Sequence, residues 1–423
     1  MVCGEERVRT ILHSDLNNFY ASVELLKHPE SKDKPVVVCG RVEDRHGIVL
    51  AKNQIAKNFG VKTGDVLWEA KRKCGGSIVS FTADHDSYLR VSNAVRGIYS
   101  RFTDHIENFG IDECWLDVTD SIKFFGSGLQ IAEQIRQTVK KEIGITVSIG
   151  VSFNKVFAKL GSDMKKPDAV TLITKENYKN TVWKLPVEDL LFVGRATKTK
   201  LNSIGVKTIG DLATMDVKVL ARMLGVWGKT LYEYANGYDQ TPVNDKRVES
   251  DIKSIGNSLT DYKDLENFDE VKTLIMLLAE SVAARLRRHN VGKAKTVKLT
   301  VTDNALMNFG KQAKLDYPTR SAIDIANCAY KIFETLYTWE RPVRAIGVSV
   351  RDFTYDREQL GLLCDVEKKL KTEQLDRAVD LIRGKYGNQI LQRATILQDE
   401  ILSKKDVQGN YMMSSDDFTN IED

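Results

Sequence analysis

Two acidic sites, each at the end of a strand-like run, constrain this 423-residue chain more than any other feature. Val8–Leu16 is apolar enough for a buried strand and carries Asp15 near its end. His105–Thr119 indicates two strands that meet at a tight bend, where Asp112 and Glu113 lie. We expect both runs to be neighbours in one sheet, with the three carboxylates close together.

The elements around these acids predict the topology of that sheet. A helix from about Phe19 follows the first strand, and apolar residues at helical spacing predict a second helix over Gly128–Ile143. A strand over Ile145–Ser152 and a helix over about Asn154–Asp163 come next. This order is typical of a split βαβ, ferredoxin-like sheet, with residues 26–81 as an insertion.

The rest of the chain predicts two further parts. Short helices separated by glycines cover about 174–236, and the polar segment Asn244–Lys253 is a candidate linker. A second α+β unit follows, with expected helices over Asp269–Asn290 and Ser321–Thr338 and strands over Lys295–Thr302 and Ala345–Phe353. One amphipathic helix is expected near Lys368–Tyr386, and the polar end, 403–423, is expected to be disordered.

Composition indicates a globular protein of two to four domains, with 42% hydrophobic and 28% charged residues. We find no run of about 18 apolar residues, so no membrane partner is expected. The N-terminal MVCGEERVRT does not have the pattern of a signal or transit peptide. Six scattered cysteines favour reduced thiols over zinc or disulfides, so we expect a cytoplasmic protein: Cys3, Cys39, Cys74, Cys114, Cys328 and Cys364.

Charge is distributed unevenly along the chain. Residues 356–423 carry 10 basic and 14 acidic side chains, a net charge of −4. Because the whole chain has a net charge of +4, the first 355 residues carry about +8. A basic body with an acidic tail fits a nucleic-acid-binding protein, although many other enzymes share this pattern.

The carboxylates allow a specific chemistry. Acids at strand ends beside a helix start are suited to Mg²⁺, which prefers oxygen ligands and keeps positions open for phosphate. Two such ions can activate a hydroxyl and neutralise a leaving pyrophosphate. Single acids at strand ends are more often turn or helix caps, so spacing alone leaves both interpretations open.

Three sequence motifs extend this picture. They are Ile11-Leu-His-Ser-Asp-Leu-Asn-Asn-Phe-Tyr20-Ala-Ser-Val-Glu24, Gly110-Ile-Asp-Glu-Cys-Trp-Leu-Asp-Val118, and Gly150-Val-Ser-Phe-Asn-Lys-Val-Phe-Ala-Lys159-Leu-Gly-Ser-Asp-Met-Lys-Lys-Pro167. In content, order and separation they resemble the motifs of Y-family translesion DNA polymerases. The resemblance covers nearly the whole chain and is strongest to the bacterial DNA polymerase IV and V branch.

The resemblance implies an α+β, right-hand polymerase that adds nucleotides to a primer on a DNA template, at low fidelity and across lesions. A ferredoxin-like palm would comprise residues 1–25 and 82–173, with small fingers at 26–81. A helical thumb with a helix-hairpin-helix would cover 174–240, and an α+β little finger 248–355. Residues 356–423 would form a clamp-binding tail.

By the same resemblance, Asp15, Asp112 and Glu113 are the catalytic residues. Together with the backbone carbonyl of Leu16 they would bind two Mg²⁺ ions, for which Mn²⁺ is an expected substitute. The primer 3′-hydroxyl would then attack the α-phosphate of a deoxynucleoside triphosphate. Asn17 stands where many members of the family have an acid that is not a direct ligand, so we expect activity to survive.

The resemblance also implies a nucleotide site. Tyr20 would be the steric gate against ribonucleotides, whereas without the motif simple core packing would be the better interpretation. The backbone N–H groups of Asn18 and Phe19 would bind the triphosphate at a helix start. Lys159 would contact the triphosphate, with a solvated helix lysine as the plain alternative.

In the expected fingers, Ile48 and Leu50 would cover the nascent base pair, and their size argues against very bulky lesions. Gln54 and Lys57 replace the usual Tyr and Arg that contact phosphates. Lysine keeps the charge but loses the bidentate fork of arginine, so nucleotide affinity is expected to differ. Lys52 is a candidate to compensate.

Two basic regions are candidates for DNA binding. Gly194, Arg195, Lys198 and Lys200 belong to the expected thumb hairpin, in which Phe192 replaces the usual first glycine. In the little finger, basic side chains crowd 14 residues that contain no acid, a pattern that also fits a merely solvated face. They are Arg285, Arg287, Arg288, Lys293, Lys295 and Lys298.

A short segment after the little finger resembles the peptide by which bacterial polymerases bind a sliding clamp. Its candidate contact residues are Gln359, Leu360, Leu362 and Leu363. The alternative is a packing segment that caps the little finger. The expected partners are therefore primer–template DNA, deoxynucleoside triphosphates and a sliding clamp, with the chain itself a monomer.

Two other functions compete with the polymerase. A nucleotidyl cyclase also uses a palm-like sheet and two metals, but it needs neither a thumb hairpin nor a basic second α+β unit. A catalytically silent DNA-binding accessory would need some defect other than loss of the three carboxylates, because all three are present.

Overall fold

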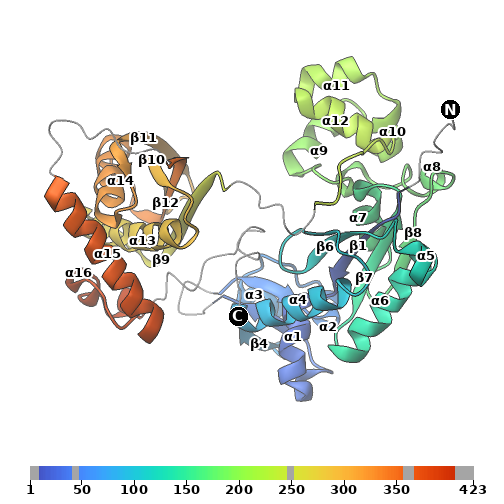
Figure 1. Cartoon of the computed structure of the whole chain (residues 1–423), viewed down its shortest axis with the longest axis horizontal. Coiled ribbons are helices and arrows are strands. Elements are labelled where there is room, and N and C mark those ends of the chain that lie inside the picture. Colours follow the sequence, from blue (N-terminus) through green and yellow to red (C-terminus); the bar gives the residue numbers. More distant parts are fainter. Residues whose placement is uncertain (1–8, 41–46, 245–251, 356–365, 405–423) are drawn as a thin grey trace. The chain divides into compact units, whose positions relative to one another are not determined.

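The computed structural model describes residues 9–40, 47–244, 252–355 and 366–404. These residues form two compact units, which meet in the chain near residue 250 (Figure 1). Unit 1 lies before this point and unit 2 after it. No helix among the described residues is long and apolar enough to cross a membrane.

The central sheet of unit 1 has five strands in the order β5-β6-β1-β7-β8. Strand β1 pairs antiparallel with β6 on one side and with β7 on the other, while β7 and β8 are parallel. The strands are β1 (Ile11–Leu16), β5 (Ile106–Asn108), β6 (Glu113–Asp117), β7 (Val147–Ser152) and β8 (Val170–Leu172). The order of the first four is that of the expected ferredoxin-like sheet.

Alternation along β1 assigns its side chains to two layers. Leu12 and Leu16 belong to the core shared with α4 (His85–Tyr99) and α6 (Gly128–Glu142). On the other face, Ile11 packs with Trp115 of β6 and with Ala158 of α7 (Lys155–Met164). His13 and Asp15 follow Ile11 at every second position, so they face α7. Two short helices complete this part, α1 (Phe19–Lys27) and α5 (Ile122–Phe125).

Helix α7 approaches the sheet closely because glycines lie at the contact. A Cβ atom on Gly150 of β7 would come within 1.9 Å of the Ala158 carbonyl oxygen. A Cβ on Gly161 would lie 3.1 Å from the Gly150 Cα. This close packing fixes the distance between the sheet and the lysines on and after α7.

The insertion forms a small three-stranded sheet in the order β3-β2-β4. Its strands are β2 (Val36–Cys39), β3 (Val49–Lys52) and β4 (Val79–Thr82), and its helices are α2 (Gln54–Asn58) and α3 (Leu67–Lys73). The 3₁₀ turn η1 (Pro29–Ser31) leads into it. Asn53 ties the parts together, because its side chain caps α2 at Ala56 N and also accepts from Val36 N at 3.0 Å.

Short helices follow, as expected for a thumb: α8 (Tyr178–Thr181), η2 (Val187–Asp189), α9 (Arg195–Ser203), α10 (Ile209–Thr214), α11 (Val217–Leu224) and α12 (Val226–Ala235). Their core is continuous with the outer side of α7. The chain after α12 returns to the start of α7, where Asn154 donates to the Gly237 carbonyl at 2.8 Å and Asp239 accepts from Lys155 N at 3.1 Å. Helix α7 thus joins the central sheet and the short helices within unit 1.

Unit 2 has a four-stranded antiparallel sheet in the order β11-β10-β12-β9, with two helices packed on one face. Its elements are β9 (Ser254–Leu265), α13 (Phe268–Arg288), β10 (Lys293–Asp303), β11 (Asn308–Thr319), α14 (Ala322–Leu336) and β12 (Val343–Thr354). The edge strands β9 and β11 were not expected, because their sequences are polar and few of their residues are buried. These polar segments form strands because their backbones pair with the apolar strands β10 and β12.

The expected helix near 368–386 is α15 (Val366–Tyr386), followed by α16 (Ala394–Leu397) and α17 (Glu400–Ser403). Its inward stripe is charged. Asp380 and Asp376 accept from Arg287 of α13 at 2.5 and 3.2 Å, and Arg383 donates to the buried Glu280 at 3.0 Å. Ion pairs therefore attach this C-terminal segment to the helical layer of unit 2.

We predict that Gly150→Ala destabilises unit 1 by about 1–3 kcal/mol, because the new methyl group overpacks the contact with α7. Gly97→Ala is the matched control, since Gly97 is an exposed residue of helix α4 with nothing within 4 Å of its Cβ position. Helix propensity then predicts unchanged or slightly higher stability. Chemical unfolding followed by tryptophan fluorescence measures both variants. Equal stability of the two would contradict the close packing of α7.

Candidate active site

The register of two strands brings the first pair of acids together. Asp15 of β1 lies directly opposite Glu113 of β6, so both side chains project from the same face of the sheet. Asp15 is 5% exposed, and this low exposure makes its charge a strong constraint on its neighbours. The sheet thus brings together residues that are almost 100 positions apart.

Asp112 lies at the bend before β6, which is attached on two sides. The Asp112 carbonyl accepts from Leu16 N at 3.0 Å, and this bond joins the bend to the end of β1. Helix α4 holds the other side: Arg96 donates to the Gly110 carbonyl at 3.0 Å, and Ser92 donates to the Ile111 carbonyl. The three acids therefore lie at one edge of one sheet, as predicted.

Two lysines and a histidine surround the acids. Lys166, just after α7, donates to Asp15 at 2.6 Å, and Lys159 of α7 donates to Glu113 at 2.5 Å. His13 Nε2 lies 3.2 Å from Glu113 Oε2. Lys159 was a candidate from the sequence, whereas Lys166 and His13 were not. Both belong to the motifs that carried the resemblance, which was the signal that could have indicated them.

The acids affect one another's protonation. Burial raises the pKa of Asp15 to about 7, assisted by the charge of Glu113 and opposed by Lys166. Burial and Glu113 also raise the pKa of Asp112. Burial acts in the same direction on Glu113, but its bonds to His13 and Lys159 outweigh it and hold the pKa at about 2. Burial lowers the pKa of His13 to about 4.

This electrostatic pattern fits a divalent cation. Burial, assisted by the neighbouring carboxylates, raises the pKa values of Asp15 and Asp112, and two ammonium groups balance the negative charge. Among the described residues, no three His, Cys, Asp or Glu side chains stand ready around one point. Asp15 and Glu113 instead pair with Lys166 and Lys159 in this structure. The carboxylate oxygens are the ligands that Mg²⁺ and Mn²⁺ prefer.

The chain after β1 turns directly into helix α1. Asn18 has φ +50° and precedes α1, whose first N–H groups have no partner inside the helix. Asn17 is buried and links three segments: it donates to Ser148 at 2.9 Å and accepts from Thr146 at 3.1 Å and from Asp168 N at 2.8 Å. Asn17 therefore orders the segment that carries Lys166.

Tyr20 lies in the first turn of α1 and is half-buried. Its ring stacks on Tyr88 of α4 with a centroid distance of 4.2 Å and an interplanar angle of 14°. Tyr88 in turn donates to the buried Glu24 at 2.7 Å. Burial and the nearby Asp112 raise the pKa of Tyr20, so its hydroxyl end lies toward the acids. A rigid aromatic ring thus borders the carboxylates.

The finger residues are distributed over β3 and α2. Ile48 is 52% exposed, while Val49 between Ile48 and Leu50 is buried, so Ile48 and Leu50 project away from the fingers core. Gln54 begins α2 and donates to Asn58 at 3.0 Å. Burial and the positive charge of Lys57 lower the pKa of Lys52. These two lysines are therefore close enough to interact electrostatically.

The thumb hairpin keeps its conformation without the usual glycine. Phe192 has φ +69°, the left-handed region that a glycine normally occupies. Its ring packs on Trp227 at 5.2 Å, which offsets backbone strain of about 1–3 kcal/mol. Gly194 then caps α9, with Arg195 and Lys200 exposed, while Lys198 pairs with Glu188 at 2.5 Å.

The basic run of unit 2 divides into two groups. Arg285 is 8% exposed and donates to the Gly256 carbonyl, and Arg287 is held by the acids of α15. These two arginines therefore have partners within unit 2, and their expected role on DNA stays a prediction. Lys293 lies 3.6 Å from Glu373. Arg288, Lys295 and Lys298 are exposed.

The open face of the unit 2 sheet is uniform in character. Directly paired residues form one row, Gln312, Lys298, Ser349 and Gly256, and a second row, Gly310, Thr300, Gly347 and Ser258. Neither row contains a carboxylate. A small, polar and partly basic surface of this kind suits a phosphate backbone.

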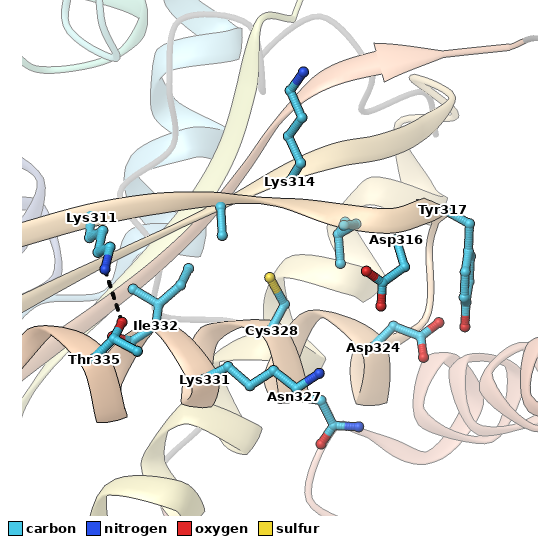
Figure 2. A pocket seen from close by; sticks show the side chains of 12 residues that line it. Lys311, Lys314, Asp316, Tyr317, Asp324, Asn327, Cys328, Lys331, Ile332 and Thr335 are labelled. Atoms are coloured by element: carbon cyan, nitrogen blue, oxygen red, sulfur yellow. Dashed lines mark hydrogen bonds between the residues drawn. The ribbon is translucent and has the colours of Figure 1, made fainter.

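A pocket of about 400 Å³ lies elsewhere in unit 2, between β11 and α14 (Figure 2). Lys311, Lys314 and Lys331 line it together with Asp316 and Asp324. The candidate clamp residues Gln359, Leu360, Leu362 and Leu363 lie outside the described residues.

Comparisons with known proteins agree with this geometry. The model of the impB/mucB/samB family matches residues 14–163, and the model of its C-terminal domain matches 252–362. A model described as the DNA polymerase-iota thumb domain matches 188–239. The DNA polymerase IV of Acetivibrio thermocellus is 52% identical over 398 residues, which are 94% of this chain and 99% of that protein. The chain belongs to the impB/mucB/samB family.

Other similarities support this membership. The DNA polymerase IV of Clostridium acetobutylicum is 34% identical and covers 93% of this chain and 99% of its own length. A Y-family DNA polymerase chimera of Dbh and Dpo4 segments shares the fold, with a TM-score of 0.70 at 24% identity over 82% of this chain and 100% of that one. The predicted α+β right-hand fold is thereby confirmed.

The predicted family and activity are also confirmed. This member of the impB/mucB/samB family is a Y-family, DNA-directed DNA polymerase for translesion synthesis. Its family implies the use of a divalent metal and substrates consisting of template–primer DNA and nucleotides. The cyclase and silent-accessory alternatives are therefore set aside.

Proposed function

We propose that this polymerase joins deoxynucleotides to a primer through Asp15, Asp112 and Glu113, which would bind two Mg²⁺ ions together with the Leu16 carbonyl. The supporting observation is the strand register that sets Asp15 opposite Glu113, with Asp112 bonded to the end of β1. When bound, the ions would activate the primer 3′-hydroxyl and neutralise the leaving pyrophosphate, and Mn²⁺ would substitute for Mg²⁺.

The other residues of this edge would bind and orient the nucleotide. The N–H groups of Asn18 and Phe19 would bind phosphate at the start of α1. Lys159 and Lys166, freed from their acids, would bind the triphosphate. In the fingers, Lys57 would contribute charge together with Lys52, and Gln54 a hydrogen bond, while Ile48 and Leu50 would cover the base pair. Asn17 would keep the Lys166 segment in order.

Tyr20 would select the sugar. Its ring is rigid because it stacks on Tyr88, and a rigid ring beneath the sugar clashes with a 2′-hydroxyl. The alternative of simple core packing is disfavoured by its half-exposed position beside Asp112.

DNA would contact both units. In the thumb, Gly194, Arg195 and Lys200 would bind duplex phosphates without sequence preference, with Lys198 available on release from Glu188. In unit 2, Lys298 of β10 would approach the backbone from the face whose two described rows contain no carboxylate, with Arg288, Lys293 and Lys295 contributing positive charge nearby. Five domains remain proposals: a palm (1–25 and 82–173), fingers (26–81), a thumb (174–240), a little finger (248–355) and a tail (356–423). Clamp binding by the tail, a monomeric state and a cytoplasmic location stay predictions.

We predict that Glu113→Gln reduces primer extension with Mg²⁺ and deoxynucleotides by at least about a thousandfold. The substitution removes a ligand charge without changing size, and metal stabilisation of the transition state amounts to several kcal/mol. Glu142→Gln is the control, because Glu142 is an exposed palm acid paired with Arg101, and it should extend at the wild-type rate. Full extension by Glu113→Gln would refute the assignment. If the wild type released pyrophosphate without a template, that result would favour a cyclase. If the wild type bound DNA tightly but did not extend the primer, that result would favour a silent accessory.

Tyr20→Ala is expected to lower the preference for deoxynucleotides over ribonucleotides by roughly 10- to 100-fold, because it opens space beneath the sugar. Tyr20→Phe keeps the ring and should keep the selectivity. Single-nucleotide incorporation with each sugar gives the ratio of kcat/KM values. An unchanged ratio in Tyr20→Ala would show that another group excludes the 2′-hydroxyl.

A further inference from the structure

A buried histidine lies directly behind one of the proposed metal ligands. His13 precedes Asp15 by two positions on β1 and has 0% of its surface exposed. Its Nδ1 lies 2.8 Å from Ser162 Oγ on α7, and its Nε2 lies 3.2 Å from Glu113 Oε2. The imidazole therefore bridges α7 and the carboxylate across the core of the palm.

The surroundings of Nε2 leave it one partner. In the described part of the chain, this nitrogen is buried and meets no hydrogen-bond partner besides its ion-pair contact with Glu113. A buried polar nitrogen without a partner is unfavourable by about 1–3 kcal/mol. The Glu113 carboxylate, which only accepts when ionised, satisfies Nε2 if that nitrogen carries the proton.

Ser162 can fix this tautomer. Its hydroxyl lies 2.7 Å from the Lys159 carbonyl and 2.8 Å from His13 Nδ1, and it has only one proton to donate. If it donates to Nδ1, Nε2 carries the proton and faces Glu113 as a donor. If it donates to the carbonyl, Nδ1 must carry the proton, and Nε2 would direct a lone pair at a carboxylate. Each arrangement makes two hydrogen bonds, but only the first avoids directing a lone pair of Nε2 at the carboxylate.

We propose that His13 is a positioning residue that holds Glu113 Oε2 through Nε2–H, so that the other carboxylate oxygen is directed to a divalent cation. The proposal rests on the role proposed above for Glu113. Packing alone does not require an imidazole here. A phenylalanine would also fill the space beside Trp115, whose ring lies 5.2 Å from that of His13.

Metal-site carboxylates are commonly oriented by such hydrogen bonds, and losing one reduces metal affinity or activity by about 10- to 100-fold. His13 is also held in place more firmly than Lys159, the other residue whose side chain contacts Glu113. Lys159 is proposed to move to the nucleotide, whereas His13 is enclosed by Trp115, Ser162 and the sheet. Glu113 then keeps one fixed contact during each cycle of nucleotide addition.

The test compares His13→Phe, which loses the donor, with His13→Gln, which returns an N–H donor at a similar distance from the backbone. Mn²⁺ binding is measured by electron paramagnetic resonance on the full chain with DNA that has a dideoxy-terminated primer and a matching deoxynucleotide. We expect His13→Phe to bind Mn²⁺ at least about 10-fold more weakly than the wild type. His13→Gln should bind Mn²⁺ with an affinity within about threefold of the wild type. The Mg²⁺ concentration that gives half-maximal extension should rise in parallel.

A second measurement does not depend on metal binding. Nitrogen-15 spectra of histidine-labelled protein distinguish the two neutral tautomers, and we expect proton-bearing Nε2 for His13. The opposite tautomer, or unchanged Mn²⁺ binding by a folded His13→Phe variant, would overturn the proposal. So would equal weakening by both variants, because that result indicates packing alone.

A failure of the proposal for His13 can be distinguished from a failure of the proposed function. If Glu113→Gln leaves extension intact, the assignment of Glu113 itself fails. If Glu113→Gln abolishes extension while His13→Phe changes neither Mn²⁺ binding nor the Mg²⁺ requirement, only the role of His13 fails.

Discussion

The pairing of β1 with β6 imposes the central constraint on this polymerase. It sets Asp15 opposite Glu113 at the edge of a sheet, with Asp15 almost completely buried. Like charges in such a position repel one another and are poorly hydrated, so they need cations. The positions of Lys159 and Lys166 follow from this need, and so does the suitability of the site for divalent metals.

The scaffold around the acids serves to hold this arrangement. The glycine contact at Gly150 lets α7 approach the sheet, which brings Lys159 and Ser162 within reach of β1 and β6. Asn17 bonds to the Asp168 segment and so orders the chain beside Lys166, which explains why an amide suits a position where relatives of the family often carry an acid. The amide donates and accepts at once, whereas a carboxylate only accepts.

Much of this could be predicted from the sequence, because the apolar strands and helices of the palm have clear periodicity. The edge strands β9 and β11 could not, since their polar residues become strands only by pairing with β10 and β12. The helix near 368–386 was expected, but its charged inward stripe was not, because Asp376, Asp380 and Arg383 have buried partners far away in the sequence.

The site shows the same division. The motifs identified Asp15, Asp112 and Glu113, and the resemblance supplied Tyr20 and Lys159. The roles of His13 and Lys166 depend on distances between segments about 100 to 150 residues apart, which no local pattern contains. Burial likewise distinguishes the members of the basic run in unit 2. Arg285 and Arg287 bind partners within the unit, whereas Lys295 and Lys298 are exposed to solvent.

The most direct measurement is anomalous scattering from Mn²⁺ in crystals of the full chain with primer–template DNA and a deoxynucleotide. We predict two Mn²⁺ peaks bordered by oxygen atoms of Asp15, Asp112 and Glu113, with Lys166 and Lys159 withdrawn from the acids. Peaks at another place, or carboxylates still paired with the two lysines while a nucleotide is bound, would contradict the convergence of these acids on a metal site.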